Sequence, residues 1–203
     1  MLKNVLGVGR RMSSLASLRA LPRIDPLTAM SEADIEKFAE EGAVVLRGVL
    51  PPAWIEVLRE AAEANMSNPG PLCDEHAAAQ GTAGRFHDDQ FLWRRHDEFA
   101  EYVLRSGAGA LAARAMRSAT AHIFYDQLFV KEPGTAASTP WHNDTSYWHM
   151  EGQQICSIWL ALDDVSQSII RKTSNQQTPQ TDTLTNIQHH NSHAHTPSNE
   201  RRA

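Results

Sequence analysis

The chain has 203 residues, of which 41% are hydrophobic and 21% charged, so length and composition predict one globular domain with an appendage. Its 24 acidic and 19 basic side chains give a formal net charge of −5, which excludes the positive field that nonspecific nucleic-acid binding needs. No run of about 18 apolar residues occurs, which excludes a membrane-spanning helix, so we expect a soluble protein.

Residues 1–30 differ in composition from the rest of the chain. Serines accompany the basic residues Lys3, Arg10, Arg11, Arg19 and Arg23. No acidic residue occurs before Asp25. This bias is typical of a mitochondrial transit segment and fits a disordered leader equally well. We therefore predict a leader over residues 1–30 and either a mitochondrial or a cytoplasmic location.

From Ser31 the pattern is that of a folded domain, which we place at residues 31–165. Ser31 and Asp34 form a capping-box pattern and Gly42 supplies a stop, which predicts a helix over residues 31–41. The short β-branched run at 43–50 predicts a buried strand. A second helix starts near Trp54, where apolar residues recur at helical spacing. Residues 69–83 are predicted to form a loop.

A third helix is predicted to follow Asp97, which can cap it. A fourth helix, separated from the third by Gly107 and Gly109, is predicted to end near Arg117. His87, Asp88, Asp89 and His96 lie in charged stretches, where solvation or capping explains them. Alternation over 120–131 and the apolar run at 155–162 predict two strands. Helices followed by antiparallel strands indicate an α+β fold with a jelly-roll or sandwich core.

The composition changes abruptly after Val165. Residues 166–203 contain no aromatic residue and no glycine, and they are rich in serine, threonine, asparagine and glutamine. Such a segment buries too little apolar area to offset its chain entropy. We therefore predict a low-complexity disordered tail without conventional secondary structure.

One motif suggests chemistry, the His142-x-Asp144 pair with its aromatic neighbours Trp141, Tyr147 and Trp148. In extended backbone, side chains two residues apart project to one face, so an imidazole and a carboxylate can bind one cation. That donor pair suits iron(II) in a site of two histidines and one carboxylate. A solvated surface pair would give the same two residues, and the motif alone leaves both interpretations open.

Three longer segments resemble the phytanoyl-CoA dioxygenase family over about residues 31–165. They are Tyr125-Asp126-Gln127-Leu128-Phe129-Val130-Lys131-Glu132-Pro133-Gly134-Thr135, Trp141-His142-Asn143-Asp144-Thr145-Ser146-Tyr147-Trp148 and Ile158-Trp159-Leu160-Ala161-Leu162-Asp163-Asp164. The run from Phe38 to Leu50 is similar to the family's entry helix and first strand. The resemblance implies N-terminal helices and an incomplete double-stranded β-helix core of the cupin type.

The same resemblance implies an oxidoreductase that uses iron(II), 2-oxoglutarate and dioxygen to hydroxylate an unidentified small molecule. His142 and Asp144 match the family's first two iron ligands. Gln127 and Trp159 match positions that contact 2-oxoglutarate, although both residues could instead pack the core. The resemblance identifies neither the substrate nor an oligomeric state.

The chain departs from the family after Val165. Family members continue there with an Asn-Gly turn, a Pro-Gly-Ser-His motif, a distal histidine and an arginine that binds 2-oxoglutarate, and none of these is present. The tail histidines His189, His190, His193 and His195 lack the rigid support that a preorganised metal site requires. A catalytically inactive fragment or pseudoenzyme with a binding or regulatory role is therefore the alternative hypothesis.

Overall fold

The computed structural model describes residues 14–76, 84–135, 142, 144–150, 152 and 154–164, and the backbone of 184–189. Its helical elements are α1 (Leu15–Arg19), α2 (Pro26–Ala29), α3 (Glu32–Glu41), α4 (Pro52–Ser67), η1 (Leu92–Arg94), α5 (Asp97–Arg105), α6 (Ala108–Ala115) and η2 (Asp144–Tyr147). Its strands are β1 (Ala43–Arg47), β2 (Asp74–His76), β3 (Phe86–Gln90), β4 (Gln127–Lys131), β5 (Cys156–Leu160) and β6 (Leu184–His189). None of the helices in this part of the chain is both long and apolar enough to cross a bilayer.

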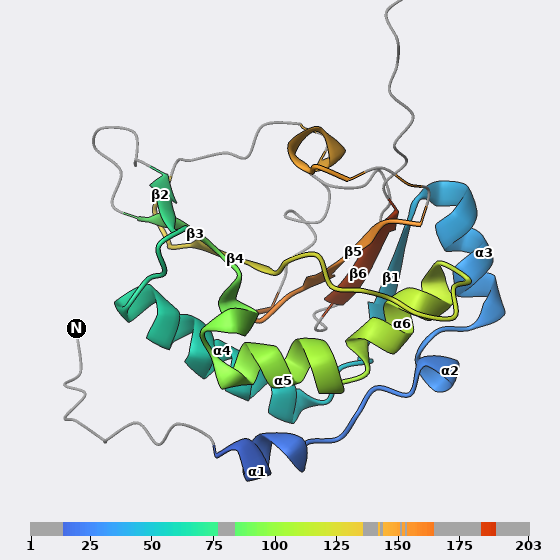
Figure 1. Cartoon of the computed structure of the whole chain (residues 1–203), viewed down its shortest axis with the longest axis horizontal. Helices are drawn as coiled ribbons and strands as arrows, with labels where there is room; N and C mark the ends of the chain where they lie inside the picture. The colour runs from blue at the N-terminus through green and yellow to red at the C-terminus, as the bar shows by residue number, and fades with distance from the viewer. Residues whose placement is uncertain are drawn as a thin grey trace, which may run out of the picture.

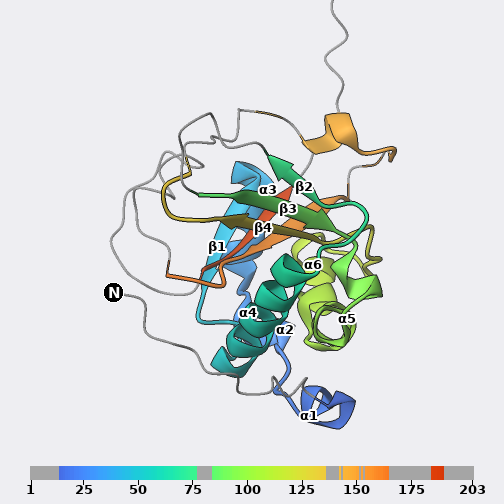
Figure 2. The same ribbon diagram turned by 90° about the vertical axis from the view of Figure 1, so that its left-hand side faces the viewer.

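The strands form two antiparallel three-stranded sheets, in the orders β1-β6-β5 and β2-β3-β4. In the first sheet β6 pairs with β1 and with β5, and in the second Asp88 of β3 lies opposite Phe129 of β4. Helices α4, α5 and α6 lie on one side of the strands, and the turn η2 lies on the other (Figures 1 and 2). Helices and antiparallel sheets together confirm the α+β class.

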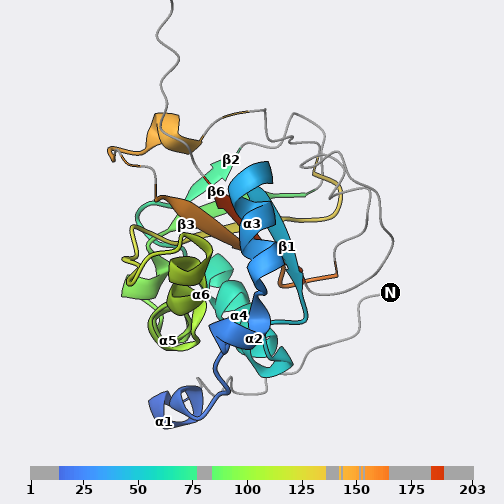
Figure 3. The same cartoon turned by 90° about the vertical axis from the view of Figure 1, so that its right-hand side faces the viewer.

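The helices begin and end largely where local sequence signals predict. Ser31 and Asp34 form the capping box of α3, and Gly42 ends that helix in the left-handed conformation, with φ 75°. Helix α5 begins at Asp97 but has His96 as its N-cap, without a side-chain capping hydrogen bond. Figure 3 shows α3 beside β1, an arrangement in which the turn at Gly42 reverses the chain and leads directly into the strand.

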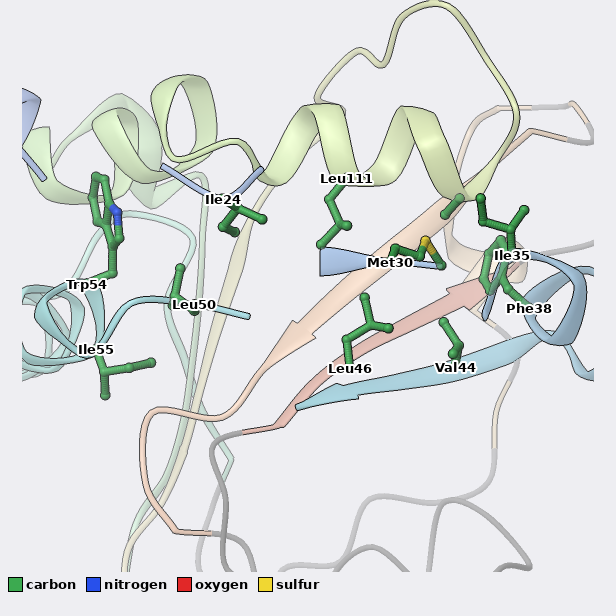
Figure 4. Packing of buried hydrophobic residues seen from close by; sticks show 11 residues of the cluster. Ile24, Met30, Ile35, Phe38, Val44, Leu46, Leu50, Trp54, Ile55 and Leu111 are labelled. Carbon is green, nitrogen blue, oxygen red and sulfur yellow. The ribbon is translucent and has the colours of Figure 1, made fainter. Parts of the chain in front are cut away.

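Two apolar clusters join the helices to the sheets. The first contains buried side chains from α3, β1, α4 and α6 and from the segment before α3 (Figure 4): Ile24, Met30, Ile35, Phe38, Val44, Leu46, Leu50, Trp54, Ile55, Leu111 and Ala115. The second joins Leu58 of α4 to Leu128 of β4 and Phe99 of α5. Burying each of the larger side chains contributes roughly 1.5–3 kcal/mol. Because both clusters include α4 residues, this helix connects the two sheets.

Residues 14–30 belong to the folded domain, whereas the sequence predicts a leader up to residue 30. Leu18, Ile24 and Met30 are only 1%, 5% and 0% exposed. The Trp54 indole N–H donates to the Pro22 carbonyl at 2.8 Å, and the Ile24 amide donates to Ser106 at 2.6 Å. Because these apolar residues have no helical or strand period, composition does not reveal their burial. The basic stretch at residues 1–13 lies outside the described residues.

The tail also differs from the prediction, because strand β6 lies within residues 166–203. It occupies the centre of its sheet, where it pairs Asn186 with both Val45 and Trp159. Pairing on both sides satisfies the backbone groups of a polar segment and removes an edge from each of β1 and β5. Histidines 190, 193 and 195 lie outside the described residues, so their predicted lack of support is not tested.

Two further strand predictions need correction. The predicted strand at 120–131 is regular only over β4, from Gln127 to Lys131. The predicted loop at 69–83 contains β2, and the polar run Phe86–Gln90 forms β3 at the centre of its sheet. Strand β3 pairs with β4 from a distant part of the chain, so the local pattern is a poor guide to this sheet.

Candidate active site

His142 and Asp144 come together as the motif predicts, although the backbone differs from the predicted extended form. Asp144 begins the short helix η2, and its Oδ1 lies 2.9 Å from His142 Nε2. The two side chains are 40% and 33% exposed, so the pair is open to solvent. Adjacent ligands of an octahedral cation, with bonds of about 2.1 Å, lie about 3 Å apart. Without a metal these two atoms form a partly exposed ion pair, and their donor types and separation would also fit adjacent positions on one cation.

A hydrogen-bonded chain connects this segment to β4 and β3. The Trp148 indole N–H donates to the Tyr125 hydroxyl at 3.2 Å, and that hydroxyl donates to Gln127 Oε1 at 3.1 Å. Gln127 Nε2 then donates to Asp88 Oδ1 at 2.7 Å. We call this set the Trp148–Asp88 chain. It brings the predicted cosubstrate residue Gln127 to the same side of the molecule as the segment that contains His142 and Asp144.

Aromatic packing supports the centre of the Trp148–Asp88 chain. The rings of Tyr125 and Trp148 lie 6.1 Å apart at 75°, and Phe124 packs edge-on against both. Burial raises the pKa of Tyr125, and the charges of Asp144 and Asp88 raise it further, against the effect of the Trp148 hydrogen bond. The hydroxyl therefore keeps its proton near neutral pH and can donate it to Gln127.

Trp159 occupies the face of β5 that points away from the helices. It is 43% exposed, whereas its neighbours Ile158 and Leu160 pack against the apolar clusters. Gln127 has the equivalent position on β4, because the adjacent Leu128 is buried among the helices. The structure thus brings His142 and Asp144 into direct contact and connects Gln127 to Trp148 of their segment through Tyr125, while Trp159 lies on the other sheet.

A third metal ligand does not join His142 and Asp144 within the described part of the chain. There, the one group of three cysteine, histidine or acidic side chains with converging ligand atoms consists of Cys73, His87 and Asp89. His87 and Asp89 are fully buried, whereas the sequence places them in a solvated stretch. Cysteine, histidine and aspartate can all bind metals, so the hydrogen bonds of this second cluster decide its role.

The hydrogen bonds of His87 leave neither ring nitrogen for a cation. Nδ1 lies 2.6 Å from Glu75 Oε1, and a carboxylate oxygen accepts, so Nδ1 carries the proton. Nε2 lies 3.1 Å from Asn65 Nδ2, which donates, so Nε2 uses its lone pair there. Asn65 cannot be turned around, because its Oδ1 accepts from Arg95 at 2.8 Å and from His96 at 3.1 Å. His87 is therefore a structural histidine.

Both carboxylate oxygens of Asp89 also accept hydrogen bonds from neighbouring groups. Its Oδ2 accepts from Asn65, from the Gly70 backbone and from Arg95 at 2.9, 2.8 and 2.7 Å, and its Oδ1 accepts from the Gln90 backbone. Burial alone would raise the pKa of Asp89, but these donors and the Arg95 charge lower it below its usual value. Burial and the neighbouring carboxylates raise the pKa of Cys73, so its thiol stays protonated.

We call the buried residues Asn65, His87 and Asp89, together with their more exposed partners Arg95 and His96, the buried polar network. Burial and the Arg95 charge lower the pKa of His96, which favours a neutral ring. The network fixes α4, β3 and η1 relative to one another, since its members come from these elements and the residues just after η1. No sequence signal reveals it, because the residues that it joins by hydrogen bonds are 6 to 31 positions apart in the chain. Tyr125 is likewise recognisable only once its contacts are known.

Comparison with known proteins gives one positive result. The family model for phytanoyl-CoA dioxygenase (PhyH) matches residues 38–168, which is well over half of the chain. The match includes β1, α4, the buried polar network, β4, the His142–Asp144 pair and β5. A search of curated proteins finds no significant match.

Proposed function

Because the chain belongs to the phytanoyl-CoA dioxygenase family, we propose that it is an iron(II)- and 2-oxoglutarate-dependent hydroxylase. Family members generally depend on these cofactors. In this proposal the two antiparallel sheets are part of a double-stranded β-helix, and the site lies on the face opposite the helices. The observation that supports it most directly is the 2.9 Å separation of His142 Nε2 and Asp144 Oδ1 at a solvent-open position.

Each predicted site residue has a role in the proposal. His142 and Asp144 hold the metal through an imidazole nitrogen and a carboxylate oxygen. Gln127 and Trp159 line the position of 2-oxoglutarate. Iron with 2-oxoglutarate would supply the activation of dioxygen that oxidises an unreactive carbon of the substrate. The protein's own contribution is to hold these groups in place and to exclude water from them.

Aromatic side chains around the pair support a site for an organic molecule. The Tyr147 ring lies 6.1 Å from the His142 ring at 79°, and it is 73% exposed. Phe124 and Trp148 continue this apolar surface toward β4. Such surfaces suit the apolar part of a small-molecule substrate, which aromatic edges can contact while polar groups orient it. A small organic molecule is therefore the proposed partner.

One observation favours a second candidate function, an inactive protein that retains a binding role. No third cysteine, histidine or acidic ligand joins His142 and Asp144 among the described residues. A site with two protein ligands would hold metal less tightly than one with three. In that case the aromatic surface could still bind a small molecule without oxidising it.

Metal titration and product analysis separate the two functions. Cobalt(II), a substitute for iron(II) that does not oxidise in air, is titrated into the parent chain and His142→Ala. The proposal expects at least tenfold weaker binding by the variant. His122→Ala, which removes another exposed histidine, is the matched control and should bind like the parent. Cobalt binding that is the same in the parent and His142→Ala would overturn the proposed metal site.

Succinate release then distinguishes an enzyme from a binding protein. The parent chain is incubated with iron(II), 2-oxoglutarate and dioxygen, and succinate is measured. The enzyme hypothesis expects release that His142→Ala abolishes and His122→Ala preserves. Cobalt binding that depends on His142 without any succinate release would favour the inactive binding protein instead.

A further inference from the structure

The amide of Gln127 is held at both ends by groups that fix which way it points. Asp88 presents a carboxylate oxygen, which accepts, so Nε2 must face it at 2.7 Å. The Tyr125 hydroxyl gives its only proton to Oε1 at 3.1 Å. Turning the amide around would place two acceptors against each other at Asp88. Gln127 therefore has one defined orientation on the face of β4 that points away from the helices.

The Trp148–Asp88 chain runs in one direction and includes the segment of the metal-binding pair. An indole N–H can only donate, so Trp148 determines that the Tyr125 oxygen accepts and that its proton points to Gln127. Hydrogen bonds that run in one direction polarise and strengthen one another. Trp148 directly follows η2, the turn that Asp144 begins. The position of this turn is thus linked to β4 and β3.

We infer that Tyr125 and Asp88 are positioning residues of the proposed metal site, an inference that rests on the proposed function. They orient the Gln127 amide and, through Trp148, hold segment 142–148 against β4. Neither residue contacts the metal in this scheme. Their loss weakens metal binding because His142 and Asp144, both solvent-exposed, then have less support for a shared geometry.

The main experiment measures cobalt(II) affinity in Tyr125→Phe. This variant keeps the ring that packs against Phe124 and Trp148 but removes the hydroxyl. We expect roughly tenfold weaker binding, the lower end of the effect that supporting hydrogen bonds have at metal sites. Tyr102→Phe is the matched control, because it removes the same atom from a partly buried tyrosine that packs against Trp54. Cobalt affinity should be unchanged there.

Two readouts separate positioning from a general loss of structure. In the metal-free protein, the Trp148 indole N–H resonance, assigned with Trp148→Phe, should shift and exchange faster in Tyr125→Phe but not in Tyr102→Phe. Asp88→Asn retains an acceptor for Gln127 and should keep cobalt affinity, whereas Asp88→Leu should lose about as much as Tyr125→Phe. An unchanged indole resonance, or equal affinities for Asp88→Asn and Asp88→Leu, would overturn the inference.

The outcomes distinguish this inference from the proposed function. Cobalt binding that needs both His142 and the Tyr125 hydroxyl supports both. Binding that needs His142 but is equal in the parent and Tyr125→Phe overturns the positioning role alone. Binding that does not need His142 overturns the proposed metal site and the positioning role with it.

Discussion

The molecule contains two groups of histidine and aspartate residues that differ in how their polar atoms are used. In the buried polar network, His87 and Asp89 are fully buried, and each has its ligand atoms occupied by neighbouring donors or acceptors. The His142–Asp144 pair is 40% and 33% exposed and lies beside aromatic rings. The residue types are the same, so burial distinguishes the group that is fixed inside the fold from the group that solvent and a ligand can reach.

Removal of one carboxylate from each group should give the largest difference in the free energy of unfolding. Asp89→Ala leaves Arg95, Asn65 and the Gly70 amide without their shared acceptor, and we expect a loss of about 3–5 kcal/mol in the free energy of unfolding. Asp144→Ala, in the metal-free protein, should cost less than about 1 kcal/mol, because its ion pair is exposed. Urea unfolding measures both. Equal losses would show that the two groups do not differ as the structure indicates.

Asp126, a partly buried carboxylate that belongs to neither group, offers a test by pH. Its carboxylate accepts from the Trp93 backbone, and burial raises its pKa from 3.8 to about 6. Because the folded pKa is the higher one, the folded state binds the proton more tightly, and this stabilisation is full below about pH 4 and lost as the pH rises through about 6. Asp126→Asn has no such proton to lose.

The difference in unfolding free energy between Asp126→Asn and the parent should therefore change with pH. From pH 4 to pH 8 it should shift by about 2 kcal/mol in favour of the variant, a value reduced from the full effect of the pKa shift because the group is partly exposed. Unfolding in urea at several pH values gives this difference, in which other titrating groups cancel. A constant difference across the range would mean that Asp126 has an ordinary pKa in the folded protein.

Addition of metal should stabilise the folded protein through the His142–Asp144 pair and not through the buried polar network. With cobalt(II) at about ten times its dissociation constant, the unfolding free energy of the parent should rise by about 1.4 kcal/mol. Asp144→Ala should gain little at the same cobalt concentration. His87→Gln, although less stable from the outset, should show the same gain as the parent, because His87 has no lone pair for a cation. A gain that disappears in His87→Gln would move the metal site to the buried polar network.

The same contrast explains which features the sequence reveals. The capping box at Ser31 and the spacing of His142 and Asp144 are local, so a short window contains all the information, and α3 appears where predicted. Gln127 and Trp159 are identified only by resemblance, and the functional roles of all four site residues remain predictions. By contrast, the polar strand β3 owes its burial to Asn65 and Arg95, which belong to other elements. Its side-chain pattern alone indicates a solvated segment.

At both ends of the domain, the described residues differ from the prediction for a similar reason. Leu18 and Ile24 are buried by contact with the distant helices α4 and α5 and the residues around them, while their own stretch has the composition of a leader. Strand β6 is defined by its pairing with β1 and β5, which come from remote parts of the chain. The composition of a segment indicates how much apolar surface it can bury by itself. It does not indicate the burial or strand pairing that distant parts of the chain provide.

Substitution of Cys73 should have the smallest effect on stability, and it tests directly whether the group of Cys73, His87 and Asp89 binds a metal. Its Sγ lies 3.6 Å from His87 Nδ1, and the proton on that nitrogen already points to Glu75 at 2.6 Å. If the cluster is purely structural, Cys73→Ala removes only a weak contact, and we expect a change in unfolding free energy of less than about 1 kcal/mol and no change in cobalt affinity. If the cluster held a metal, its thiolate would be the strongest ligand, and the same substitution would weaken cobalt binding at least tenfold. Because the two hypotheses differ so little in stability, the metal titration is the measurement that decides between them.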